Sequence, residues 1–300
     1  MRLSGAEVVD TFAEAFPMWG ARIVITADTP AWAQEASRSL TGFATSVIGC
    51  KCEAGVEREL GPDETPDGRP GVSALLFAPD RKGLAKRLVE RVGQCVLTCP
   101  TTACFDGLDG EETVNVGGQL RFFGDGYQAS KVLDGRRYWR VPVMEGEFLV
   151  QERFGVAEGV GGGNIIMLGA DSATALRAAE AAAEAMRAVR GVVLPFPGGI
   201  ARSGSKVGSR YSGLMASTND ALSPTLRAQV PNSEVPPGVG SVFEIVIDGL
   251  TLEAVSDAMA AGLEAAAWSG ASHLTAGNYG GNLGPYHIAL KDLVPGAGEA

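Results

Sequence analysis

One pattern recurs four times along this chain, and it restricts the folds that the chain can adopt. Each copy has an apolar stretch typical of a strand, a segment with helical periodicity, a second predicted strand, and a turn or loop rich in glycine or small residues. The copies span residues 21–55, 72–107, 164–201 and 241–282. The pattern repeats, whereas the residue identities do not. In the first copy, Pro30 follows a suitable N-cap, Thr29, and occupies the first helical position.

Two strand–helix–strand copies in under about a hundred residues predict a ferredoxin-like lobe, an antiparallel sheet with two helices on one face. The four copies therefore predict an α+β protein with two ferredoxin-like lobes, each in βαββαβ order. Residues 119–154 alternate aromatic and polar residues around turn signals, so we expect extra strands that join the lobes. We expect an N-terminal lobe with these connecting strands in residues 1–150. The C-terminal lobe, with a long inserted loop, would occupy residues 151–300.

A doubly wound parallel sheet is the alternative fold. It predicts a glycine-rich dinucleotide-binding turn after the first strand. Residues 25–32, ITADTPAW, contain no glycine. We therefore rank the parallel sheet second.

Composition argues against several classes of function. The formal charge of −10 and the pI near 4.8 would repel a phosphate backbone, and no basic tract with interleaved aromatic residues is present. No apolar run approaches the ~18 residues that span a bilayer, and the first residues lack the pattern of a signal peptide. We therefore expect a cytoplasmic protein without nucleic-acid or membrane partners.

Three of the five cysteines lie within residues 93–105, GQCVLTCPTTACF. An odd number of unevenly spaced cysteines does not indicate a disulfide framework, so we expect free thiols. If residues 95–99 form a strand, Cys95 and Cys99 lie about 13 Å apart, too far to share a metal ion. Cys50 and Cys52 would add ligands only if two strand ends met. We expect buried, inert thiols, with a metal or redox site as the minor alternative.

Two loops carry the polar side chains that suit a binding site. Residues 199–207, GIARSGSKV, nearly match a P-loop, but Ser205 displaces Lys206 by one position, so we discount nucleotide hydrolysis. We predict an anion-binding loop that uses Arg202, Ser203, Ser205 and Lys206, with a solvated basic loop as the alternative. The loop after residue 99 offers the hydroxyls of Thr101 and Thr102.

Glu244 is the candidate acid. It lies in the predicted strand FEIVIDG and, by alternation, shares a face with Val242, Val246 and Asp248. Apolar neighbours remove water from a carboxyl group and raise its pKa. A carboxylic acid that stays protonated near neutral pH suits acyl exchange between amines. The alternative is an edge-strand glutamate in water.

Several segments together resemble the formylmethanofuran–tetrahydromethanopterin N-formyltransferase family, nearly from end to end. They are DTFAEAFPMWGARIVITADTPAWA, TGFATSVIGC, ETPDGRPGVSALLF, VGQCVLTCPTTACF, FFGDGYQASK, RRYWRVPVMEGEF, LPFPGGIARSGSKVGS, EIVIDGL and TAGNYGGNLGPYH. The resemblance implies two ferredoxin-like lobes and a cytoplasmic enzyme of one-carbon metabolism. It implies reversible transfer of a formyl group between formylmethanofuran, or a bacterial analogue, and N5 of tetrahydromethanopterin. Both carriers would be substrates, and no metal or prosthetic group is implied.

The resemblance also implies partners and site residues. Family members form homodimers and homotetramers with the active site near the subunit contact. They act in methanogenesis or, in methylotrophic bacteria, within a formyltransferase/hydrolase complex. Glu244 matches the family's proposed catalytic glutamate, and Asn278 and Tyr279 match a loop that would bracket the pterin. A non-catalytic carrier-binding or scaffold subunit is the alternative function.

Overall fold

The computed structural model describes residues 1–294, and internal contacts divide the chain into two compact units. Unit 1 contains Met1–Pro17 and the chain from Val160 onward, and unit 2 contains Met18–Gly159. The predicted N-terminal lobe, 1–150, includes the first 17 residues, which here group with the C-terminal part. Residues 295–300 of the predicted second lobe lie outside the described residues.

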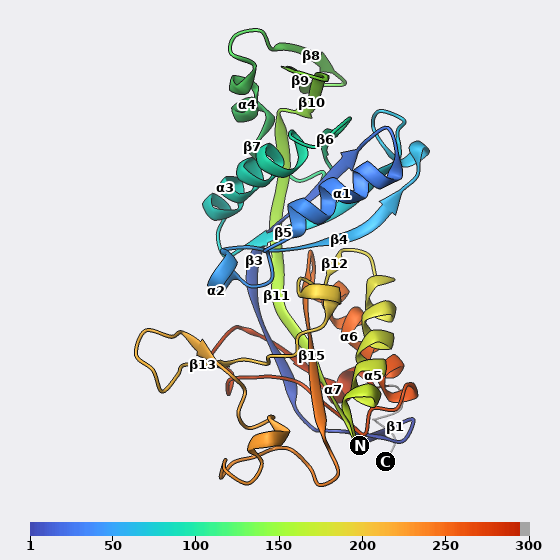
Figure 1. The fold of residues 1–300 in the computed structure, drawn as a ribbon, viewed down its shortest axis with the longest axis vertical. Coiled ribbons are helices and arrows are strands. Elements are labelled where there is room, and N and C mark those ends of the chain that lie inside the picture. Colours follow the sequence, from blue (N-terminus) through green and yellow to red (C-terminus); the bar gives the residue numbers. More distant parts are fainter. Residues whose placement is uncertain (295–300) are drawn as a thin grey trace. The chain divides into compact units, whose positions relative to one another are not determined.

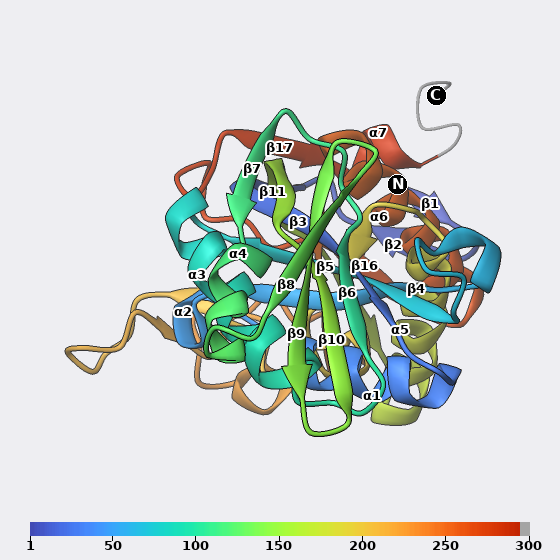
Figure 2. The same cartoon turned by 90° about the horizontal axis from the view of Figure 1, so that it is seen from above.

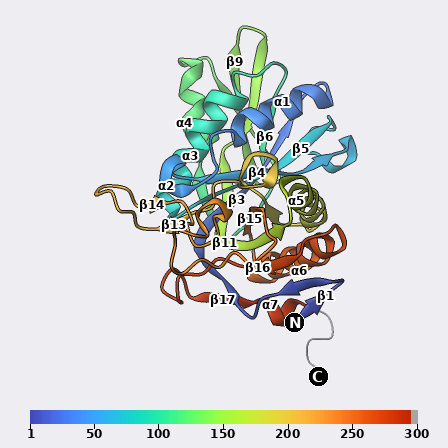
Figure 3. The ribbon, with the colours of Figure 1, turned by 60° about the horizontal axis from the view of Figure 1, so that its bottom comes forward.

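Two long strands explain this division. β3 (Phe12–Thr26) and β11 (Arg153–Gly169) each contribute one end to unit 1 and the other end to unit 2. The first residues of β3 pair with β17 (Tyr286–Ala289) near the C-terminus, and this pairing holds the N-terminal segment in unit 1. Figure 3 shows β17 and β1 at the end of the ribbon where the N-terminus is marked.

Unit 2 contains the first ferredoxin-like sheet. Its strand order is β4-β5-β3-β6, and every neighbouring pair is antiparallel. The chain passes through β3, α1, β4, β5, α3 and β6, which is the predicted βαββαβ order. The bounds of the remaining elements are α1 (Pro30–Thr41), β4 (Glu53–Leu60), β5 (Gly71–Ala78), α3 (Arg81–Arg91) and β6 (Ala103–Asp106).

Further strands extend this sheet beyond β6. β10 runs parallel to β6 and then pairs with β9, which pairs with β8 (Figure 2). Extra strands were predicted for residues 119–154, and they are present as β8 (Ala129–Leu133), β9 (Arg136–Val143) and β10 (Gly146–Gln151). Shorter elements of unit 2 are α2 (Val47–Cys50), η1 (Pro62–Glu64), η2 (Val92–Val96), β7 (Glu112–Asn115), α4 (Gly117–Leu120) and η3 (Arg121–Gly124).

Unit 1 repeats the same topology. The order β12-β15-β11-β16 is antiparallel throughout, and the chain passes through β11, α5, β12, β15, α6 and β16. Figure 1 shows α5 and α6 together beside β15. The bounds are α5 (Ser172–Arg187), β12 (Val192–Val193), β15 (Ser241–Gly249), α6 (Leu252–Trp268) and β16 (His273–Thr275). The prediction of two ferredoxin-like lobes is therefore confirmed.

Short elements complete unit 1. β2 lies parallel to β16 and antiparallel to β1, while β13 and β14 form a small hairpin within the long stretch 202–240. The bounds are β1 (Arg2–Leu3), β2 (Ala6–Val8), η4 (Pro197–Gly199), β13 (Lys206–Val207), β14 (Ala216–Ser217), η5 (Pro224–Leu226) and α7 (Leu290–Leu293).

Helix caps and small side chains explain the local structure. Thr29 caps α1 as predicted, since its hydroxyl accepts the N–H of Trp32. In unit 1, α5 buries alanines at helical spacing against α6 and β15, so the two helices approach closely without large side chains between them. These alanines are Ala175, Ala178, Ala179, Ala182 and Ala183.

The prediction of a strand at residues 95–99 is wrong. The helix that starts with α3 continues as a π-helical turn over Val92–Val96, and β6 begins only at Ala103. Leu84, Leu88, Val92 and Val96 are four residues apart and fully buried, so helical spacing outweighed the β-branched composition. Residues 47–50, where the first copy of the repeated pattern predicted its second strand, are helical, and the strand near residue 192 is present with two residues.

The cysteines are correspondingly rearranged. Cys95 lies in the π-helical turn and Cys99 in the turn that follows it, so the 13 Å separation expected for a strand does not apply, and Cys104 lies buried in β6. Residues 1–294 contain no group of three or more His, Cys, Asp or Glu side chains placed to hold a metal ion. In the same range, no helix is long and apolar enough to cross a membrane.

Candidate active site

The backbone of Glu244 is held from both sides in the middle of β15. On one side Glu244 is in register with Ile166 of β11. On the other side its N–H donates to the carbonyl oxygen of Ala201 at 3.0 Å, and its own carbonyl oxygen accepts the N–H of Ala201 at 2.8 Å. The start of the 202–240 stretch is thereby fixed directly beside Glu244.

The Glu244 side chain is partly buried and borders a cavity of about 560 Å³ within unit 1. Burial raises the pKa of this carboxyl from 4.5 to about 7. Arg202 lines the same cavity, together with the hydroxyl-bearing residues Ser203, Thr218 and Ser223. A carboxylic acid, a guanidinium and several hydroxyls therefore share one open space.

A second cavity of about 650 Å³ adjoins the first through Thr218, which lines both. Lys206, Arg210 and Tyr211 contribute to its wall. The ammonium of Lys206 pairs with Asp220 at 2.6 Å, and the hydrogen bond from Lys206 lowers the pKa of Asp220. Lys206 therefore already has an anionic partner in unit 1, whereas Arg202 is exposed.

Tyr279 links the loop after β16 to the Arg202–Lys206 segment. Its phenolic Oη donates to the carbonyl oxygen of Ser205 at 3.3 Å. Burial raises the pKa of Tyr279, the negative charges of Glu244 and Glu14 raise it further, and the Ser205 hydrogen bond only partly opposes them. Tyr279 thus lies within electrostatic range of Glu244.

Asn278 uses its side chain within the fold. The amide nitrogen donates to Thr11 Oγ1 at 2.9 Å and to the carbonyl oxygen of Phe12 at 3.3 Å. Its carbonyl oxygen accepts the N–H of Gly280. Asn278 therefore anchors its own loop to β3, and its predicted contact with a pterin stays a prediction.

Unit 1 thus brings together most of the predicted site residues. Thr101 and Thr102 lie instead in unit 2. The hydroxyl of Thr102 donates to the carbonyl oxygens of Val96 at 2.6 Å and Cys99 at 3.0 Å, so it terminates the helical turn.

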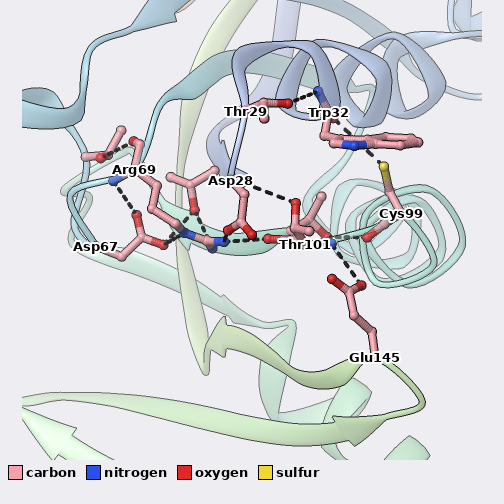
Figure 4. A network of polar contacts seen from close by, with 11 residues as sticks. Asp28, Thr29, Trp32, Asp67, Arg69, Cys99, Thr101 and Glu145 are labelled. Atoms are coloured by element: carbon pink, nitrogen blue, oxygen red, sulfur yellow. Dashed lines mark hydrogen bonds and ion pairs between the residues drawn. The ribbon is translucent and has the colours of Figure 1, made fainter.

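Thr101 is a backbone outlier in a polar network of unit 2 (Figure 4). Its φ is +62°, a left-handed conformation that costs a β-branched residue about 1–3 kcal/mol. Its N–H donates to Glu145 at 3.0 Å, its hydroxyl accepts the N–H of Asp28 at 3.1 Å, and its carbonyl oxygen accepts from Arg69. All of its polar groups are therefore engaged.

Arg69 is the centre of this network, and we predict that Arg69→Lys destabilises the protein. The guanidinium pairs with Asp67 and Asp28 and also donates to Thr26 and Thr101, contacts that a lysine cannot make together. The free energy of unfolding should fall by about 1–3 kcal/mol in urea titrations. Arg136→Lys, at an exposed ion pair, should change it far less; equal losses in both variants would contradict this role.

The sequence argument missed Glu14. This carboxylate is 1% exposed, and its oxygens accept the backbone N–H groups of Tyr279, Gly281, Leu283 and Gly284. Burial alone would raise the pKa of Glu14, but these N–H groups outweigh burial and lower it. The available signal was a single carboxylate among apolar residues in the strand FAEAF.

Two ferredoxin-like lobes and a partly buried carboxyl group beside an open, hydroxyl-lined cavity define the class, a two-lobed α+β protein with a candidate site for transfer chemistry. The family model described as formylmethanofuran-tetrahydromethanopterin formyltransferase matches residues 1–143, and the model of its proximal lobe matches residues 146–293. This chain belongs to the formylmethanofuran–tetrahydromethanopterin formyltransferase family. The predicted family and the predicted transferase class are both confirmed.

Relatives from bacteria and archaea agree with this assignment. The formylmethanofuran–tetrahydromethanopterin formyltransferase of Methylococcus capsulatus is 55% identical over 298 residues, with 98% of this chain and 100% of the relative covered. The solved formyltransferase/hydrolase complex of Methylorubrum extorquens with methylofuran contains a chain with TM-score 0.95 and 54% identity, at 98% coverage of both chains. The formyltransferase structure from Methanosarcina barkeri gives TM-score 0.93 and 47% identity, with 98% and 100% coverage.

Proposed function

We propose that this chain transfers a formyl group reversibly between formylmethanofuran, or a bacterial analogue, and N5 of tetrahydromethanopterin, with Glu244 as the catalytic acid. One observation carries this assignment of the site. Glu244 borders the cavity with a pKa of about 7, so much of it is protonated at neutral pH. A protonated carboxyl group can both donate to a developing oxyanion and move a proton.

The reaction in the direction of the pterin begins when N5 attacks the formyl carbon. A new N–C bond forms and the carbonyl oxygen becomes an oxyanion, which the Glu244 carboxylic acid stabilises by donating a hydrogen bond. The intermediate collapses as the C–N bond to the furan amine breaks. Glu244 gives its proton to the departing nitrogen and takes up the proton that N5 loses, so the carboxylic acid is restored at the end of the reaction. Holding both substrates together can supply up to ~7–11 kcal/mol of the barrier.

The remaining residues have supporting roles in this proposal. Arg202 suits carboxylate or phosphate groups on the anionic tails of the carriers, because it is exposed in the same cavity as Glu244. Ser203 and Ser205 are candidates for further oxyanion donors. Lys206 is already paired with Asp220, so it would contribute only a positive charge that this carboxylate partly compensates.

Tyr279 would stack on or hydrogen-bond to the pterin, because its phenol reaches Ser205, in the same segment as Arg202, which lines the cavity beside Glu244. Thr101 would act only by donating its hydroxyl proton, since its backbone N–H and carbonyl oxygen are engaged by Glu145 and Arg69. Thr102, whose hydroxyl is engaged twice, is the weakest of the predicted binding residues.

The proposal includes partners. The relative from Methylorubrum extorquens is a subunit of a formyltransferase/hydrolase complex, which supports hydrolase subunits as partners of this chain. A homodimer or homotetramer and a cytoplasmic location, both implied by the resemblance, belong to the same proposal. Sedimentation of the purified chain alone and with candidate hydrolase subunits tests the assembly.

The pH dependence of transfer tests the acid role directly. We expect kcat/KM to be flat below about pH 7 and to fall about tenfold per pH unit above it, because only protonated Glu244 is active. The measurement is the absorbance change of the pterin in initial-rate assays with a formylated furfurylamine carrier. A rate that instead rises through pH 7 would make Glu244 a base.

The alternative, a carrier-binding scaffold, predicts a different result in the same assay. A scaffold would bind both carriers, as measured by calorimetry, but would transfer no formyl group at any pH. A scaffold would also keep its function when Glu244 is replaced by glutamine, whereas the enzyme would lose transfer activity.

A further inference from the structure

Glu14 holds the loop that carries Tyr279. Glu14 lies in the part of β3 that pairs with β17, opposite His287, and the chain from Ala276 to Pro285 connects β16 to β17 above it. Near the start of this connection, the N–H of Gly277 donates to Asn164 Oδ1 at 2.6 Å, just before the loop of residues 278–284. Glu14, 1% exposed, lies under the rest of the loop.

The Glu14 carboxylate is matched to four backbone donors. Oε2 accepts the N–H groups of Tyr279 at 2.7 Å and Gly281 at 3.1 Å. Oε1 accepts those of Gly284 at 2.9 Å and Leu283. An ionised carboxylate has about four lone-pair sites and no donor, whereas a glutamine would turn an NH₂ group toward two of these N–H groups.

The loop sequence suits this arrangement. Gly280 and Gly281 have φ values of +70° and +78°, which allow the chain to turn its N–H groups inward. Gly284 passes so close to the carbonyl oxygen of Ala15 that a Cβ there would overlap it. The path of the loop over Glu14 is therefore narrowly defined.

The loop carries Tyr279 to the site. The Tyr279 N–H is bound by Glu14, and the phenol of the same residue reaches the carbonyl oxygen of Ser205. Ser205 belongs to the segment that starts at Ala201, which is hydrogen-bonded to the backbone of Glu244. A chain of contacts therefore runs from the buried Glu14 carboxylate through Tyr279 and the segment 201–205 to the backbone of Glu244.

We propose that Glu14 is a positioning residue for formyl transfer, which acts by fixing the loop of residues 278–284 so that the phenol of Tyr279 stays bound to Ser205, in the segment that is paired with the Glu244 backbone through Ala201. The inference rests on the proposed function, because the effect of Tyr279 is on the reacting pterin. Glu14 touches no reacting atom. Its loss alters the alignment of the pterin and leaves the binding of the furan carrier intact.

The first test measures loop order without reference to activity. Hydrogen exchange followed by mass spectrometry should show faster exchange for residues 278–284 in Glu14→Gln than in wild type. Exchange in α5 should be unchanged. Unchanged exchange in the loop would overturn the proposal, whether or not the chain transfers formyl groups.

The second test measures the reaction. In Glu14→Gln, kcat/KM for tetrahydromethanopterin should fall about 10- to 100-fold, while KM for the formylated furan carrier changes less than about threefold. Glu14→Asp, which keeps the charge, should recover part of the loss. Glu264→Gln, at an exposed position on α6, is the matched control and should behave as wild type.

A double-mutant cycle separates positioning from general damage. If Glu14 acts through Tyr279, the losses of Glu14→Gln and Tyr279→Phe should be non-additive, and the double variant should resemble the worse single variant. Additive losses, or equal loss toward both carriers, would overturn the role. Glu14→Asp replaces Glu14→Gln in the cycle if the latter does not fold. A wild type without transfer activity would reject the proposed function separately from the exchange result.

Discussion

Glu244→Gln should lower kcat for formyl transfer by two or more orders of magnitude. Glutamine has nearly the same shape and can still donate a hydrogen bond, but its amide cannot give up a proton to the departing nitrogen. The measurement is the initial rate of pterin formylation near pH 7, with Glu264→Gln as the control for replacing a glutamate by glutamine. Equal rates in Glu244→Gln and wild type would remove Glu244 from the mechanism.

Thermal unfolding of the same variant distinguishes lost chemistry from lost folding. The pKa of Glu244 is about 7 in the folded chain and ordinarily 4.5, so the folded protein loses stability as the pH rises from 4.5 to 7. Above pH 7, Glu244→Gln should therefore be more stable than wild type by about 1–3 kcal/mol, and below pH 4.5 this gain should disappear. An inactive variant that is also more stable would exclude misfolding as the cause.

Among the substitutions considered, Gly155→Ala should cause the largest loss in the free energy of unfolding. Gly155 lies in β11 opposite Thr113 of β7, and a Cβ at this position would overlap the carbonyl oxygen of Leu108, with the backbone nitrogen of Gly110 also close. The overlapping atom belongs to the backbone, so no side-chain rotation can relieve the clash. We expect a loss of about 3 kcal/mol or more in the free energy of unfolding.

Urea titration of Gly155→Ala measures this loss, and Gly49→Ala is its control. A Cβ at Gly49 in α2 meets no atom within 4 Å, so that substitution should be close to neutral. A Gly155→Ala protein as stable as wild type would mean that β7 and the chain near Leu108 separate from β11 at no cost.

Much of the fold could be predicted because its elements carry strong local signals. Strand 241–249 follows regular alternation, helix α5 follows helical spacing, and Thr29 caps its helix as the sequence suggests. Residues 95–99 were wrongly predicted as a strand, whereas the four-residue spacing of buried side chains that starts at Leu84 continues to Val96 and keeps this part of the chain helical. The tertiary core favoured the helix.

The site was predictable only where a residue's own strand determines its surroundings. The burial of Glu244 follows from its alternation with apolar neighbours along β15. The role of Glu14 depends on a loop more than 260 residues away, and the engagement of Lys206 by Asp220 depends on the path of an irregular segment. Such long-range pairings leave no periodic trace in a single sequence.

The composition of unit 1 from two separated segments has a consequence for synthesis on the ribosome. Unit 2 is continuous, so all of its residues emerge before Val160. Residues 1–17 emerge before unit 2, yet β17 pairs with Phe12–Ala15 and is among the last described residues to be made. During translation residues 1–17 must therefore wait, with their apolar side chains unpaired, until β17 has emerged. The loop over Glu14 can close only after that point.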